Sequence, residues 1–202
     1  MPPQSGFRQG HCQLYAAMCK HLGSFYQLIT FHLIFNIQFS IFTGVILENP
    51  YLPYPVRIDH ISVETEDKNL KTFRFVFLNP EDEEKFAYHA GQFAELSVTG
   101  KGEIPIGIAS SPTEKGFVMF TVNKVGVVSS YLHAMKEGDI MGVRGPLGNW
   151  YPWEQMEGKN VVIIGGGFAF TTLRSSIIYM LDPANRPKFK DIHVIYGART
   201  PG

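Results

Sequence analysis

The chain has 202 residues, of which 45% are hydrophobic, 18% charged and 13% aromatic, a composition that excludes an intrinsically disordered protein. Lys and Arg together number 18, as do Asp and Glu, so the formal charge of zero leaves no basic surplus for binding nucleic acid. Cys12 and Cys19 match no metal or cluster spacing. No metal site is therefore expected, and the absence of later cysteines fits a reducing, cytoplasmic compartment.

Residues 1–48 are predicted to form an extension that precedes the globular part. No Asp, Glu, Lys or Arg occurs between His21 and Leu47, and the apolar segment 22–47 is long enough for a membrane helix. Polar residues such as His32 and Asn36 recur within it, and they disfavour burial in hydrocarbon. Two interpretations stand: a membrane tether through this segment, or a peripheral and non-native extension, which we favour.

Proline-rich residues 49–55 mark the start of the globular part, because proline fixes φ and interrupts regular structure. Apolar residues then alternate with polar ones, which is the period of half-buried strands. Strands are expected at 56–63, 70–77, 92–98, 104–111 and 117–124, with charged turns at 64–68 and 80–85. Short strands at this spacing predict an antiparallel barrel or sandwich.

The pattern changes after residue 126 from a strand period to a helix period. A helix is expected at 127–136, a strand at 140–143, a tight loop at 144–150 and a linker at 154–159. A buried parallel strand at 161–164, a glycine turn, a helix at 171–181 and a second strand at 192–196 follow. A β-α-β unit with two strands cannot cover its own sheet, so this second domain is expected to be incomplete.

Three stretches have the residue types of a cofactor site. Residues 104–112 combine an apolar ledge with a glycine and hydroxyl groups, and residues 126–130 place glycine and serines at a helix start. The glycines at 165–167, between strand and helix, would let backbone N–H groups approach a pyrophosphate. Each stretch alone is also typical of an ordinary strand end, cap or turn, and Phe170 replaces the last glycine of the dinucleotide-binding pattern.

The order of these stretches resembles that of the ferredoxin-NADP reductase superfamily. Two further motifs fit the same order: Arg144-Gly145-Pro146-Leu147-Gly148 lies between the second and third stretches, and Tyr196-Gly197-Ala198-Arg199 follows the third. Within the superfamily, this arrangement is most similar to the gamma subunit of hydrogenases and to the electron-transfer subunits of sulfite reductase and dihydroorotate dehydrogenase. The resemblance covers residues 49–202. It implies an antiparallel Greek-key flavin-binding barrel at 49–155, followed by the first part of a nucleotide-binding parallel α/β domain at 158–202.

The resemblance implies two sets of cofactor-binding residues and no catalytic acid or base. The FAD set is Pro105, Ile106, Gly107, Ile108, Ala109, Ser110, Ser111, Gly126, Val127, Val128, Ser129 and Ser130. The NAD(P) set is Gly165, Gly166, Gly167, Phe168, Ala169, Tyr196, Gly197, Ala198 and Arg199. Gly107 stands where the family carries a hydroxyl near the flavin, so backbone N–H is the expected replacement donor there. Thr171 and Thr172 replace the alanine and proline of the family's glycine motif.

The implied function is that of an FAD-dependent NAD(P)H oxidoreductase subunit. It would move electrons through FAD between NAD(P)H and iron-sulfur partner subunits of a hydrogenase or reductase complex. Relatives continue beyond the equivalent of Gly202 and end in a cysteine-rich segment for a [2Fe-2S] cluster, whose ligands are absent here, so the chain is expected to be a C-terminally truncated fragment. The alternative is a truncated barrel that binds flavin or a partner without turnover. The sequence chooses neither NADH nor NADPH and does not name the terminal acceptor.

Overall fold

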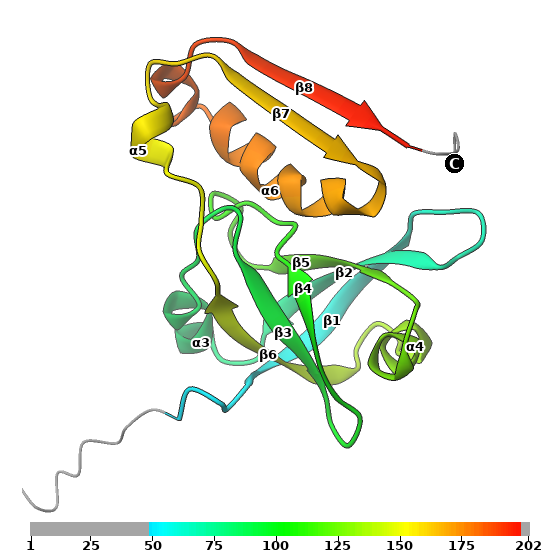
Figure 1. Cartoon of the computed structure of the whole chain (residues 1–202). Coiled ribbons are helices and arrows are strands. Elements are labelled where there is room, and N and C mark those ends of the chain that lie inside the picture. Colours follow the sequence, from blue (N-terminus) through cyan, green and yellow to red (C-terminus); the bar gives the residue numbers. More distant parts are fainter. Residues whose placement is uncertain (1–48, 199–202) are drawn as a thin grey trace, which may run out of the picture. The chain divides into compact units, whose positions relative to one another are not determined.

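The structure, a computed structural model, describes residues 49–198 (Figure 1). The predicted extension at 1–48, with its apolar segment 22–47, lies outside the described residues, as does Arg199. Within the part that is described, no helix is long and apolar enough to cross a membrane.

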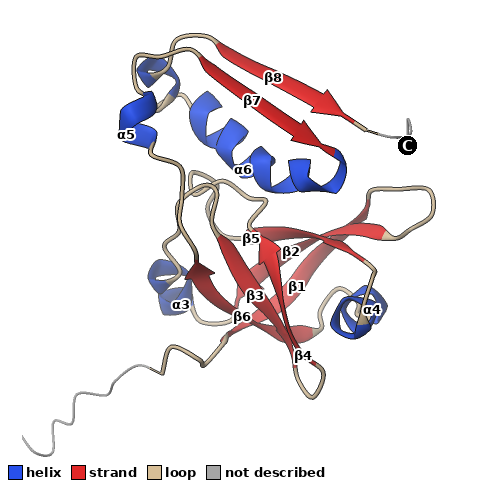
Figure 2. Ribbon diagram, viewed as in Figure 1, coloured by secondary structure: helices blue, strands red, loops and turns tan. Residues whose placement is uncertain are grey.

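Six antiparallel strands form the first part of the fold (Figure 2). They are β1 (Tyr54–Val63), β2 (Leu70–Phe77), β3 (Phe93–Val98), β4 (Gly102–Gly107), β5 (Val118–Asn123) and β6 (Ile140–Leu147). Their order in the sheet is β4-β3-β6-β1-β2-β5, and a bridge between Ile108 and Phe120 joins the two edges of the sheet. The predicted antiparallel barrel is therefore confirmed.

Alternating side chains of these strands fill the interior of the barrel. Phe73, Phe75 and Phe120 are fully buried, and the rings of Phe75 and Phe120 have centroids 5.9 Å apart. Each buried aromatic side chain stabilises the fold by about 2–3 kcal/mol relative to an exposed one. The period of two in the sequence thus reports the inner face of the barrel correctly.

Helices in this part of the chain correct several of the predicted boundaries. The predicted turn at 80–85 is the helix α3 (Pro80–Lys85), which begins with a proline and three acidic residues as helix N-termini often do. The predicted helix at 127–136 is α4 (Val127–Ala134), two residues shorter at its C-terminus. The predicted linker at 154–159 begins within α5 (Trp153–Met156), whose Trp153 is buried.

Two strand boundaries are also corrected. The strand expected at 104–111 is β4 and ends at Gly107, after which the chain makes only the Ile108 bridge. The strand expected at 140–143 continues as β6 through most of the predicted loop to Leu147, because Arg144 and Leu147 pair with β3. Arg144 is held further by a 2.7 Å ion pair with Glu103.

A parallel pair of strands with a helix between them forms the rest of the described chain. β7 (Val161–Gly166) pairs in parallel with β8 (Ile192–Gly197), and the 3-10 turns η1 (Gly167–Ala169) and η2 (Arg186–Lys188) flank the helix α6 (Phe170–Leu181). This is the predicted start of an α/β domain. The prediction that 161–164 would be buried is half wrong, because Val162 and Ile164 are 56% and 72% exposed on the sheet face opposite Val161 and Ile163, which pack with Met180 of α6.

Candidate functional site

A cavity of about 500 Å³ lies where β4, the end of β5 and the start of α4 meet. Ile104, Pro105 and Ile106 of β4 form its apolar ledge. Its other lining residues are Asn123, Val125, Gly126, Val127, Val128, Ser129 and Phe168. None of the lining residues is acidic, so the cavity suits a flat apolar ring that carries an anionic group.

The N-terminus of α4 borders this cavity. The first N–H groups of a helix have no partner within the helix, and its dipole makes this end positive. The first turn of α4 holds no acidic residue that would compete with an anion. Ser129 Oγ accepts hydrogen bonds from the N–H groups of Gly126 (2.9 Å) and Val125 (3.1 Å), which fixes the turn. The Ser129 hydroxyl is therefore engaged within the turn, and the N–H groups at 127–129, which have no partner within the helix, are the donors that remain for an anion.

The predicted FAD set does not lie together: six members line this cavity, four are buried, and Gly107 and Ser130 are half-buried outside the lining. Six of its members line the cavity: Pro105, Ile106, Gly126, Val127, Val128 and Ser129. Ser110 and Ser111 are fully buried and bond within the chain, the first to Tyr88 (2.8 Å) and the second to Thr113 (2.9 Å). Ile108 and Ala109 are buried as well. The hydroxyls of 110–111 therefore shape the loop after β4.

A second cavity, of about 750 Å³, is bordered by the glycine turn after β7. Four members of the predicted NAD(P) set line it: Gly167, Phe168, Tyr196 and Ala198. Gly165 and Gly166 instead belong to β7, where they pair with Tyr196 and Gly197. Of the three glycines at 165–167, only Gly167 has the left-handed conformation, with φ of 53°. Phe168 lines both cavities, which makes it their shared wall.

Arg174 is a residue of this second cavity that the sequence did not single out. Its guanidinium donates to the Glu114 carboxylate at 2.9 and 3.1 Å and to the Ala109 carbonyl at 3.0 Å. Burial opposes ionisation of Glu114, but hydrogen bonds from Arg174 and the Ser111 N–H outweigh it and lower the pKa of the carboxyl. The sequence did contain a signal for Arg174, because it is the single charged residue of α6.

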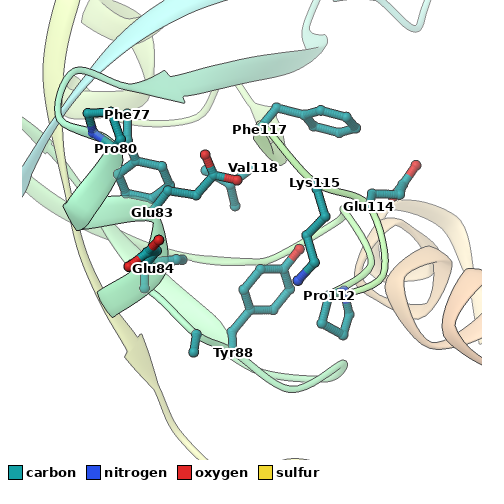
Figure 3. A pocket seen from close by; sticks show the side chains of 12 residues that line it. Phe77, Pro80, Glu83, Glu84, Tyr88, Pro112, Glu114, Lys115, Phe117 and Val118 are labelled. Carbon is teal, nitrogen blue, oxygen red and sulfur yellow. The ribbon is translucent and has the colours of Figure 1, made fainter.

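A third cavity, of about 500 Å³, lies beside α3 and has different chemistry (Figure 3). Its lining includes the carboxylates of Glu83, Glu84 and Glu114, together with Tyr88 and Lys115. Burial is the main cause that raises the pKa of Tyr88, so this phenol stays neutral. Three carboxylates disfavour a phosphate group, and none of the predicted site residues lines this cavity.

Comparison with known proteins finds similar sequences among flavin-binding oxidoreductases and electron-transfer subunits. Residues 60–151 match the model of the oxidoreductase FAD-binding domain family. Sulfhydrogenase 2 subunit gamma of Pyrococcus furiosus is 39% identical over 152 residues, which are 75% of this chain and 51% of the relative. A probable dihydroorotate dehydrogenase B (NAD(+)) electron transfer subunit of Thermococcus kodakarensis is 32% identical over 133 residues, 66% of this chain and 48% of that protein.

Solved structures show the same fold. The crystal structure of a ferredoxin NADP+ reductase from Neisseria gonorrhoeae with bound FAD and NADP superposes with a TM-score of 0.59 at 23% identity, over 73% of this chain and 58% of that one. The fold is that of ferredoxin-NADP reductases, and the homologues include hydrogenase gamma subunits and dihydroorotate dehydrogenase electron-transfer subunits. The chain spans about half the length of these curated relatives.

Proposed function

We propose that this chain is an electron-transfer flavoprotein subunit that moves electrons between NAD(P)H and iron-sulfur partner subunits through FAD. The observation that carries the proposal is the first cavity, in which an apolar ledge and a helix N-terminus adjoin without any acidic side chain. Relatives named as subunits of sulfhydrogenase and of dihydroorotate dehydrogenase B support the choice of this activity.

The residues of the chain would hold FAD without taking part in proton transfer. Ile104 to Ile106 would carry the ring, and the N–H groups at 127–129, which have no partner within the helix, would bind the pyrophosphate. Bound FAD accepts two electrons as hydride and gives them up singly, which suits an exchange between nicotinamide and iron-sulfur groups. The protein's contribution is therefore to place the ring and exclude water from it.

The glycine turn would bind the nicotinamide nucleotide. Gly167 and Phe168 line the second cavity, and Arg174, which is paired with Glu114, lines it as well. We further propose the division into a flavin barrel at 49–155 and a nucleotide-binding part at 158–202. The partners would be iron-sulfur subunits of a hydrogenase or reductase complex. The absence of cysteine after Cys19 is compatible with the cytoplasm, where we place the chain.

The second candidate is a barrel that binds flavin or a partner without turnover. The observation in its favour is that the described α/β part contains two strands, with one sheet face exposed at Val162 and Ile164. The experiment that separates the candidates mixes the chain with FAD, removes free flavin and adds NADH or NADPH without oxygen. Loss of the flavin absorption band supports electron transfer, bound flavin that is not reduced supports the binding module, and failure to bind flavin contradicts both.

A further inference from the structure

Thr172 of α6 occupies the space next to Gly107 at the end of β4. A Cβ atom placed on Gly107 would lie 2.7 Å from Cγ2 of Thr172, 2.9 Å from its Cβ, and closer still to its hydroxyl Oγ1. Real Cβ atoms are essentially never found within 3.0 Å of another heavy atom. The threonine side chain therefore fills the position that a side chain at residue 107 would take.

The strand geometry places this contact at the end of the apolar ledge. Pro105 and Gly107 share one face of β4, because side chains two residues apart in a strand point the same way. They are separated by roughly 7 Å along the strand. Pro105 lines the first cavity, so Thr172 stands beyond it on the same face, within the length of a three-ring system.

The hydroxyl of Thr172 is not engaged by another described group. The neighbouring Thr171 hydroxyl donates to the Phe168 carbonyl at 2.9 Å. The Thr172 hydroxyl, in contrast, has no hydrogen-bond partner in the described part of the chain. A hydroxyl can donate one hydrogen bond and accept others, whereas the side chains of the ledge at 104–106 can do neither.

We propose that Thr172 supplies the side-chain hydroxyl that hydrogen-bonds to the polar edge of the flavin ring, in place of a side chain at Gly107. This inference rests on the proposed binding of FAD in the first cavity. It replaces the expectation that only backbone N–H serves at this point. The flavin site is then completed by a helix of the α/β part. A substitution in α6 should therefore change the affinity for FAD even in the absence of a nicotinamide nucleotide.

The test compares FAD binding to the full chain and to Thr172→Val, which keeps the shape of the side chain and removes the hydroxyl. Quenching of flavin fluorescence gives the Kd, and the flavin absorption band reports the surroundings of the ring. Loss of one hydrogen bond of about 1 kcal/mol raises the Kd roughly fivefold. Thr172→Ser retains the hydroxyl and is expected to stay within about twofold of the wild type. Circular dichroism checks that each variant is folded.

Moving the hydroxyl from residue 172 to residue 107 tests whether the hydroxyl itself, and not the packing of Thr172, affects FAD binding. The single change Gly107→Ser overlaps Thr172 and should weaken FAD binding or the packing of α6. The double change Gly107→Ser with Thr172→Gly also removes the Cβ of residue 172 and with it the overlap, and it returns a hydroxyl to β4, so it should recover the wild-type Kd to within about twofold. If the wild type binds FAD and Thr172→Val matches it in Kd and absorption band, this inference is wrong and the proposed function stands. If the wild type itself binds no FAD, both fail.

Discussion

Arg174 of α6 reaches Glu114, in the loop that follows β4, through two hydrogen bonds of 2.9 and 3.1 Å. The same guanidinium donates to the Ala109 carbonyl at 3.0 Å. One side chain thus joins the helix after the glycine turn to the loop after the flavin ledge. Because Arg174 and Ala109 also line the second cavity, this link lies where electrons would pass from nucleotide to flavin.

Substitution of Arg174 by Met should loosen this link. We expect the free energy of unfolding to fall by about 1 kcal/mol, since the ion pair is partly exposed and water screens it. Glu114 has a lowered pKa in the folded chain, so its contribution is present above the usual carboxyl pKa and is lost as the pH falls through the folded value. Urea unfolding at pH 7 and pH 3.5 measures both effects.

The exposed Arg57 offers a matched control for Arg174. Arg57→Met removes the same charge from the outside of the barrel and should change stability by less than about 0.5 kcal/mol. Equal losses in the two variants would mean that the contact between Arg174 and Glu114 adds no stability.

Val127→Glu should have opposite effects on stability and on FAD binding. Val127 is 68% exposed in the first turn of α4, and a carboxylate there interacts favourably with the positive end of the helix by about 0.3–1 kcal/mol. The same carboxylate repels a pyrophosphate, so the Kd for FAD should rise at least about tenfold. Thermal unfolding and flavin fluorescence titration give the two values.

The control for Val127 is Ile140→Glu, which adds the same charge at an exposed position on β6. It should leave the Kd for FAD within about twofold of the wild type. Weaker FAD binding in both variants would point to net charge, and not to the start of α4, as the cause.

Substitutions at two neighbouring glycines should distinguish a role in packing from a role in nucleotide binding. A Cβ on Gly165 would meet Phe170 at 2.7 Å and the Leu173 side chain closer than that, so Gly165→Ala should destabilise the packing of α6 by about 1–3 kcal/mol. A Cβ on Gly166 meets only the Gly197 carbonyl, at the ordinary distance of 3.5 Å. Gly166→Ala should therefore keep wild-type stability while it slows flavin reduction by NADH or NADPH.

Stopped-flow reduction and chemical denaturation of the two glycine variants provide this comparison. If Gly166→Ala is as unstable as Gly165→Ala, the glycines are required for packing alone. If Gly166→Ala is stable and reduces flavin at the wild-type rate, Gly166 does not approach the nucleotide.

His133 should make the stability of α4 depend on pH. The ring is buried and its Nε2 donates to the Val122 carbonyl at 2.9 Å. Burial, with nearby Lys71 and Lys124, lowers the pKa of His133 below its usual 6.5 despite this hydrogen bond. The folded chain thus binds the proton less readily than the unfolded chain. The contribution of His133 to the free energy of unfolding is therefore fully present above pH 6.5. It falls as the pH drops below that value, by at most about 1.4 kcal/mol per pH unit.

Urea unfolding at pH 7.5 and pH 5.5 measures this dependence. His133→Gln should flatten the difference between the two pH values, whereas substitution of the exposed His193 by Gln should leave it unchanged. An equal pH dependence in the wild type and in His133→Gln would show that other groups are responsible.

Periodicity in the sequence predicted the barrel because alternating side chains such as Phe73 and Phe75 directly record which face is inside. It missed α3, since six residues are too few to show a helical period, although Pro80 followed by acidic residues was a sufficient signal for a helix start. The end of β6 was missed because a sequence containing Gly145 and Pro146 is typical of a loop, and only pairing with β3 extends the strand there.

The candidate site could be predicted in part for a similar reason. A helix start such as 126–129 is a local feature, and its donors belong to the backbone. The roles of Ser110, Arg174 and Thr172 depend on contacts between segments that are far apart in the chain, which no local pattern records. Gly107 was identified as unusual in the sequence, but the reason, a threonine 65 residues further on, required the structure.

The most direct test of the account is a titration of the chain with FAD and, in parallel, with riboflavin. We expect one FAD to bind per chain, and riboflavin to bind at least about tenfold more weakly because it lacks the pyrophosphate that the start of α4 would hold. Binding of both flavins with equal affinity would contradict the assignment of α4, and the absence of FAD binding would contradict the flavin site itself.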